Sequence, residues 1–164
     1  MKNQKVLFLT QSAMIAALYV VLTVMFQPIS FGDMQVRIAE ALTVLPAFTP
    51  AAVPGLFIGC LIGNLLGGAI LPDIIFGSLA TLLGALFTYL LRKQSKFLAP
   101  LPPIFFNTLI VPFVLRYAYK INLPMLFFML PIGIGEVISC GILGLILYTA
   151  LQKYRHKIFR TMES

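Results

Sequence analysis

Long hydrophobic runs dominate the chain from Leu7 to Leu151, and only short polar or proline-marked breaks separate them. A helix that spans a bilayer needs roughly 20 predominantly apolar residues. The pattern therefore predicts an all-α membrane protein with six transmembrane helices in one membrane domain, residues 1–164. The expected spans are residues 6–26, 36–48, 54–70, 73–91, 103–119 and 124–151.

The composition makes lipid the natural surroundings of this chain. Of its 164 residues, 60% are hydrophobic and only 10% are charged. A soluble domain of this length would expose large apolar patches. The first run, after Lys2 and Lys5, could pass for a signal peptide, but the later runs exclude a soluble remainder.

The basic residues predict the orientation. Nine of the twelve lie beside the termini or in the loops after the second and fourth spans. The positive-inside rule then places both termini in the cytoplasm. Since these residues stand at the ends of apolar runs, they indicate topology and not a nucleic-acid partner. The nine are Lys2, Lys5, Arg92, Lys93, Lys96, Lys153, Arg155, Lys157 and Arg160; the other three are Arg37, Arg116 and Lys120.

The sequence contains no recognisable catalytic set. Its one histidine, His156, lies in the basic tail, and there is no P-loop. We therefore predict a non-enzyme that does not hydrolyse ATP itself. Cys60 and Cys140 fall in apolar, glycine-rich segments and are interpreted as helix-packing residues, not as a disulfide or metal pair. No metal or cofactor is predicted.

Polar residues inside the apolar runs are the strongest functional signal. Glu136 has no basic residue within a helical turn, so its carboxylate needs a partner from another helix, a ligand or a proton. A purely structural pair with Arg116 or Arg37 is the alternative. Asn107 is a second polar group in an apolar run. Asn64 either bonds to a neighbouring backbone or faces a polar cavity.

The segment QVRIAEALTVLP, residues 35–46, carries two charges at the start of an apolar run. Arg37 and Glu40 are three positions apart, so on a helix they can pair. Such an interfacial pair needs no function, but the topology places it at the outer mouth. We interpret Glu40 as a pocket residue, with Arg37 either holding it in place or closing the loop above it. Asp73, directly after Pro72, is explained by the start of a helix.

Small residues suggest two close-packing surfaces. Ala13, Ala16 and Ala17 in the first span form a strip that another helix can approach closely. On the motif alone, packing within the bundle is favoured over docking of a partner. A glycine at every fourth position of the third span predicts a packing ridge. These glycines are Gly55, Gly59, Gly63 and Gly67.

Three motifs, QVRIAEALTVLP, GLFIGCLIGNLLGG and PDIIFGSLATLLGAL, closely resemble the queuosine-precursor transporter (QueT) family. Members of this family are the substrate-binding S components of energy-coupling-factor (ECF) transporters. The resemblance covers nearly the whole chain, whereas the alanine strip is shared by S components generally. It implies an S-component fold with an outward-opening pocket, in the cytoplasmic membrane of a prokaryote.

The resemblance also implies partners and a solute. The strip Ala13, Ala16 and Ala17 would dock on a transmembrane T subunit coupled to two cytoplasmic ATPases, so docking now outweighs internal packing. The expected solute is a deazaguanine base, queuine or its aminomethyl precursor. The alternatives are an S component for another vitamin or nucleobase, or a stand-alone permease or channel.

A deazaguanine suggests roles for the candidate residues. A carboxylate, Glu136 or Glu40, could accept from the adjacent N–H donors of the base. Asn64 or Asn107 could meet a carbonyl oxygen or ring nitrogen. Asp33, or the second glutamate, could meet an aminomethyl cation.

Overall fold

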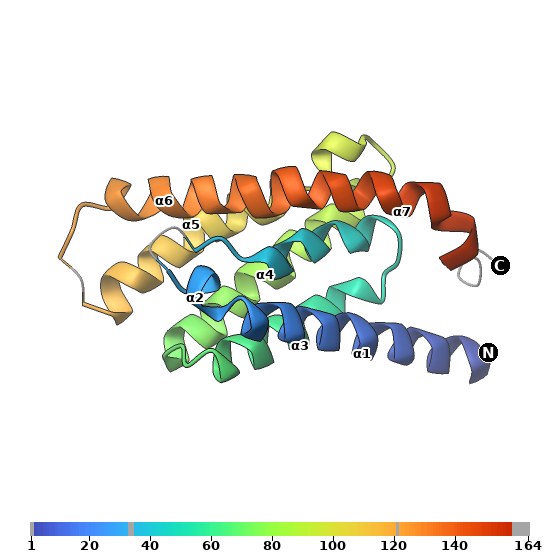
Figure 1. Cartoon of the computed structure of the whole chain (residues 1–164), viewed down its shortest axis with the longest axis horizontal. Helices are drawn as coiled ribbons and strands as arrows, with labels where there is room; N and C mark the ends of the chain where they lie inside the picture. The colour runs from blue at the N-terminus through green and yellow to red at the C-terminus, as the bar shows by residue number, and fades with distance from the viewer. Residues whose placement is uncertain (1, 33–34, 121, 159–164) are drawn as a thin grey trace.

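The computed structural model describes residues 2–32, 35–120 and 122–158, and within these ranges it contains helices and no strand (Figure 1). Hydrophobic runs dictate these helices, while glycine- and proline-rich breaks end them. The elements are α1 (Lys2–Met25), α2 (Gln27–Ser30), η1 (Ile38–Ala47), α3 (Ala52–Leu66), α4 (Leu71–Leu91), η2 (Lys96–Leu98), α5 (Leu101–Ala118), α6 (Leu126–Glu136), η3 (Val137–Leu143) and α7 (Gly144–Ile158).

Four segments are long and apolar enough to cross a membrane, which agrees with the predicted all-α membrane class. The second and third predicted spans correspond to shorter helices, Ile38–Ala47 and Ala52–Leu66. Six crossings and cytoplasmic termini therefore stay predictions. The start of α1 and the end of α7 lie at the same end of the molecule (Figure 1). The four long segments are Gln4–Met25, Leu71–Leu91, Lys96–Ala118 and Leu126–Tyr154.

The second predicted span forms a 3₁₀ helix, η1, of 10 residues. A 3₁₀ helix rises about 2.0 Å per residue, so η1 extends roughly 20 Å where an α-helix would reach roughly 15 Å. Pro46, inside η1, has no N–H to donate to a helical hydrogen bond. The Thr43 hydroxyl donates to the Glu40 carbonyl oxygen of the same element at 2.6 Å. Residues 39–46 are buried, and η1 contacts α1, α3, α4, η3 and α7. It is the central element of the bundle.

The last predicted span is one long helix made of α6, η3 and α7 (Figure 1). It extends to Ile158, beyond the predicted end at residue 151. Its middle part, η3, is a π-helix that begins directly after Glu136. Short π segments change the direction of the side chains that follow them and are frequent at functional sites.

The predicted glycine ridge on α3 is confirmed by its close contact with α1. A Cβ added at Gly55 would lie 2.7 Å from the Ser12 carbonyl oxygen, and one at Gly59 would lie 2.8 Å from Cβ of Tyr19. Only glycine allows this approach. The helix ends at Leu66, earlier than the predicted residue 70, because Gly68 adopts a φ of +80° that other residues avoid.

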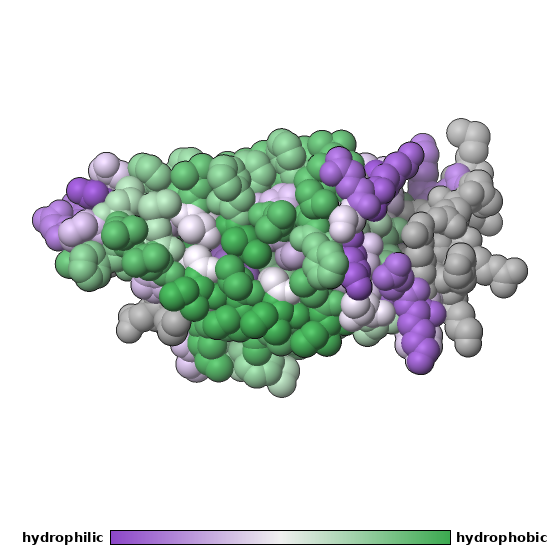
Figure 2. Space-filling view, turned by 90° about the horizontal axis from the view of Figure 1, so that it is seen from above, coloured by the Kyte–Doolittle hydropathy of each residue, from purple (hydrophilic) through white to green (hydrophobic). Residues whose placement is uncertain are grey.

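The outer surface of the bundle is apolar around its middle. Figure 2 shows hydrophobic residues over the central part of one face and hydrophilic residues at its two ends. Large side chains such as Leu18, Phe76, Phe105 and Leu130 are exposed. This distribution is typical of a protein surrounded by lipid, since lipid imposes no cost on apolar exposure.

We expect Gly59→Ala to destabilise the protein by about 1–3 kcal/mol, the usual cost of overpacking. The added methyl group would lie 2.8 Å from Tyr19 Cβ and 3.0 Å from the Ala16 carbonyl oxygen. Gly141→Ala is the matched control, because its nearest contact would be 3.7 Å away. The measurement is the melting temperature in detergent. Equal melting temperatures for the two variants would contradict the tight contact.

Candidate functional site

Glu40 lies at the centre of the bundle because η1 carries it there. It is fully buried. Its Oε1 accepts a hydrogen bond from the Tyr19 hydroxyl of α1 and another, 3.4 Å long, from the Thr81 hydroxyl of α4. Its Oε2 is also buried and has no hydrogen-bond partner among the described residues. One oxygen is therefore fixed in place, and the other is available as an acceptor.

Glu136 is the last residue of α6 and lies beside Glu40. Asn107 of α5 donates to Glu136 Oε1 at 3.1 Å, and the Cys140 thiol donates to Oε2 at 3.2 Å. The Cys140 sulfur lies 3.5 Å from the Glu40 carbonyl oxygen and 3.4 Å from the Thr43 hydroxyl oxygen. The structure thus brings Glu40, Glu136 and Asn107, three of the predicted site residues, into one buried cluster.

Arg37 does not form the predicted ion pair with Glu40. The two residues make no salt bridge within 4.0 Å, and Arg37 Nε instead donates to the Ser30 carbonyl at 3.4 Å. The guanidinium lies 5.1 Å from the centre of the Phe31 ring, and its Nη2 is buried with no partner in the described part of the chain. The expected pairing fails because Arg37 has an extended backbone before the first turn of η1.

Nor does Glu136 form the alternative structural pair with Arg37 or Arg116. Its hydrogen bonds within the described ranges are with Asn107 and Cys140. Two carboxylates therefore lie in the apolar core without a directly paired cation. A buried charge of this kind is costly unless a ligand or proton compensates for it.

Asn64 on α3 joins this cluster through Cys60. Its Nδ2 lies 3.5 Å from the Cys60 sulfur, and Thr81, which contacts Glu40, donates to the same sulfur at 3.4 Å. Asn64 Oδ1 is buried and lacks a partner among the described residues. Asn64 thus does not bond to a neighbouring backbone and extends the polar cluster toward α3.

Sequence reasoning missed four members of the cluster: Tyr19, Thr81, Cys60 and Cys140. Tyr19 had a usable signal, because tyrosines of membrane helices favour the interface and this one lies within a span. The cysteines, interpreted as packing residues, are buried free thiols that contact polar partners. Asp33, the remaining predicted site residue, lies outside the described residues.

The predicted alanine strip is divided between two faces of α1. Ala16 is buried, and its backbone lies close to Gly59 of α3. Ala13 and Ala17 are exposed on the outer side. Internal packing therefore accounts for Ala16, while only Ala13 and Ala17 remain available to a partner.

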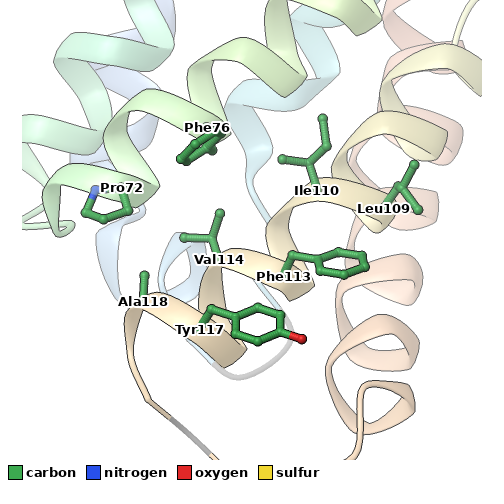
Figure 3. Close-up of a pocket in the computed structure, with 8 residues that line it drawn as sticks. All are labelled: Pro72, Phe76, Leu109, Ile110, Phe113, Val114, Tyr117 and Ala118. Carbon is green, nitrogen blue, oxygen red and sulfur yellow. The ribbon is translucent and has the colours of Figure 1, made fainter.

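The cluster is rich in hydrogen-bond acceptors. One carboxylate oxygen each from Glu40 and Glu136 and the Cys140 sulfur lie within 4.8 Å of one another. This group could hold a metal ion or a ligand with several N–H donors. An open groove of about 470 Å³ between α4 and α5 is different in character (Figure 3). Its lining, which includes Phe76, Ile110 and Phe113 in addition to Tyr117, is almost wholly carbon, and it contains none of the buried acids.

A family comparison gives this cluster its context. The sequence model described as "QueT transporter" matches residues 9–153, nearly the whole chain. The chain belongs to the QueT transporter family. No curated protein and no solved structure gives a match. QueT membership and the four long apolar segments identify a multi-pass membrane transporter, which agrees with the prediction of a non-enzyme.

We expect Tyr19→Phe to lower the stability of this QueT protein by about 1–3 kcal/mol, because Glu40 would lose a buried hydrogen-bond donor. Tyr117→Phe is the matched control, since Tyr117 is 68% exposed. Melting temperatures in detergent compare the two variants. If both variants melt like the parent, the bond between Tyr19 and Glu40 contributes nothing to stability.

Proposed function

We propose that this QueT chain is the substrate-binding S component of an ATP-driven ECF importer in the cytoplasmic membrane of a prokaryote. It captures a queuosine precursor, queuine or aminomethyl 7-deazaguanine, from outside. One observation carries the proposal: two buried glutamates lie together, and Glu40 Oε2 has no partner in the described part of the chain.

The chemistry of the base matches this arrangement. The pyrimidine edge of a deazaguanine presents adjacent N–H donors, which a carboxylate can accept in a charge-assisted pair. Glu136 is oriented by Asn107 and Cys140, and Glu40 by Tyr19 and Thr81. Fixed acceptors of this kind lower the entropic cost of binding. The donors of the base would in turn satisfy the unpaired acceptor of the cluster.

The outer face of α1 supports the proposed docking on a T subunit. Ala13 and Ala17 are exposed between large apolar side chains, so a helix of a T subunit can approach the backbone closely there. In the proposed importer the energy comes from two cytoplasmic ATPases bound to that T subunit, which is compatible with a sequence that has no P-loop. Capture of the solute and hydrolysis of ATP then lie on different chains.

Two alternatives predict different measurements. An S component for another vitamin or nucleobase would copurify with that compound, which absorbance and mass spectrometry identify. A stand-alone permease would carry solute into vesicles without ATP or partner chains. The acceptor-rich cluster favours a ligand with several donors, and so favours the deazaguanine.

We expect purified protein to bind queuine or aminomethyl 7-deazaguanine in a calorimetric titration, and to bind guanine more weakly. Glu136→Gln should weaken binding by roughly 10–100-fold, because hydrogen bonds to a charged group contribute about 1.5–3 kcal/mol. Thr108→Val, on the same helix as Asn107 but facing an apolar groove, is the control that should bind like the parent. Unchanged affinity of Glu136→Gln would remove Glu136 from the site.

We also expect Ala13→Leu combined with Ala17→Leu to prevent copurification with the T subunit and ATPases. The larger side chains would hold the partner helix away from α1. Solute binding by the isolated chain should be unchanged. Ala150→Leu, an exposed alanine on α7, is the matched control and should leave the complex intact. A double variant that still assembles would show that docking uses another surface.

A further inference from the structure

Asp73 is a buried acid that does not cap its helix, although it lies in the first turn, where the helix dipole favours a carboxylate as predicted. It lies in the first turn of α4, but the helix start at Ile70 has no side-chain cap. Asp73 is only 1% exposed, and its Oδ1 has no hydrogen-bond partner among the described residues. Oδ2 has one long contact, 3.5 Å from the Tyr119 hydroxyl. No salt bridge within 4.0 Å joins Asp73 to Arg37.

The side-chain amide of Asn64 lies next to the same part of α4 as Asp73. A Cβ built on Gly77 would lie 3.5 Å from Asp73 Oδ1 and 3.2 Å from Asn64 Nδ2, so the two side chains flank the same point on α4. Asn64 is also 1% exposed, and its Oδ1 is unsatisfied within the described ranges. At this glycine the structure therefore places one unpartnered acceptor, Asp73 Oδ1, beside the amide of Asn64, whose nitrogen is the nearer atom.

This pair is connected to the glutamate cluster along one face of α4. Asp73, Gly77 and Thr81 follow at intervals of four residues, which places them one above another on the helix. Thr81 contacts Glu40. Asp73 is thus two helical turns, roughly 11 Å, from the level of Glu40. A flat bicyclic base with a short amine arm is of comparable length.

We propose that Asp73 and Asn64 form a second subsite, at Gly77, which binds the positively charged amine arm of the solute whose ring binds at Glu40 and Glu136. This inference rests on the proposed function and adds a specificity determinant to it. An ammonium group has three N–H donors and no acceptor. It would donate to Asp73 Oδ1, which has no partner among the described residues, and neutralise the buried carboxylate. A ring with an uncharged substituent would leave Asp73 unpaired in the core, which is costly.

Tyr119 completes this subsite at its rim. It is 39% exposed and reaches Asp73 from the end of α5. Burial, and next the nearby Asp73 carboxylate, raise the pKa of the Tyr119 hydroxyl above its ordinary value of 10.0. The hydroxyl therefore stays protonated at neutral pH and acts as the donor to Asp73.

The test compares two ligands with the same ring in calorimetric titrations. One is aminomethyl 7-deazaguanine, and the other carries an uncharged methyl group in place of the aminomethyl arm. We expect the parent protein to bind the cationic ligand about 10–100-fold more tightly, the range of a charged hydrogen bond. This preference is measured without any substitution.

Two variants localise the preference. Asp73→Asn removes the charge, and Gly77→Ala fills the point between Asp73 and Asn64 while placing a better helix former in α4. Each should remove most of the preference and leave the affinity for the methyl ligand within about 3-fold. Ser78→Ala is the control, because its hydroxyl only bonds back to the Ile74 carbonyl of its own helix.

The outcomes separate this inference from the proposed function. If the parent binds both ligands equally, or if the variants weaken both equally, the subsite is wrong and deazaguanine binding stands. If the parent binds neither ligand, the proposed function fails and the subsite fails with it. If Asp73→Asn does not fold, the subsite is still tested by the preference of the parent for the cationic ligand and by the loss of that preference in Gly77→Ala.

Discussion

The need to give a buried carboxylate its partners organises this bundle. Glu40 lies in the core of a protein whose outer surface is apolar, so its hydrogen bonds must come from neighbouring helices. Tyr19 from α1 and Thr81 from α4 supply donors, and Cys140 contacts its backbone. The glycine ridge of α3 serves the same end, because it brings α1 close enough for Tyr19 to reach inward.

Hydropathy and the cost of buried polar groups made part of this arrangement predictable. The apolar runs anticipated that long helices would form, although the last one continues to Ile158, seven residues beyond its predicted end. Glu136 and Asn107 could be selected because an acid or amide inside an apolar run requires a partner. That they would meet each other, at 3.1 Å, was not foreseeable, because it depends on how α5 and α6 pack.

The remaining features leave little trace in the sequence. A run of ten 3₁₀ residues and a π segment after Glu136 are products of tertiary packing, which overrides local preference. Thr81 was overlooked because a threonine in a helix commonly bonds to its own backbone; its Oγ1 lies 3.2 Å from the Gly77 carbonyl oxygen as well as 3.4 Å from Glu40 Oε1. The expected pair of Arg37 and Glu40 assumed a helix that begins at residue 36, two residues before η1 begins.

The first helix is both a wall of the buried glutamate cluster and the candidate docking surface. Tyr19 faces the glutamate cluster, whereas Ala17, two residues earlier, faces outward. Only one helix diameter, about 10 Å, separates the two surfaces. Within a single turn, α1 therefore meets two different requirements. Tyr19 needs a hydroxyl on the inner side of the helix, and Ala17 needs to be small on the outer side. Among homologues, α1 should therefore vary less than the lipid-facing side of α5, where apolar character is the only requirement.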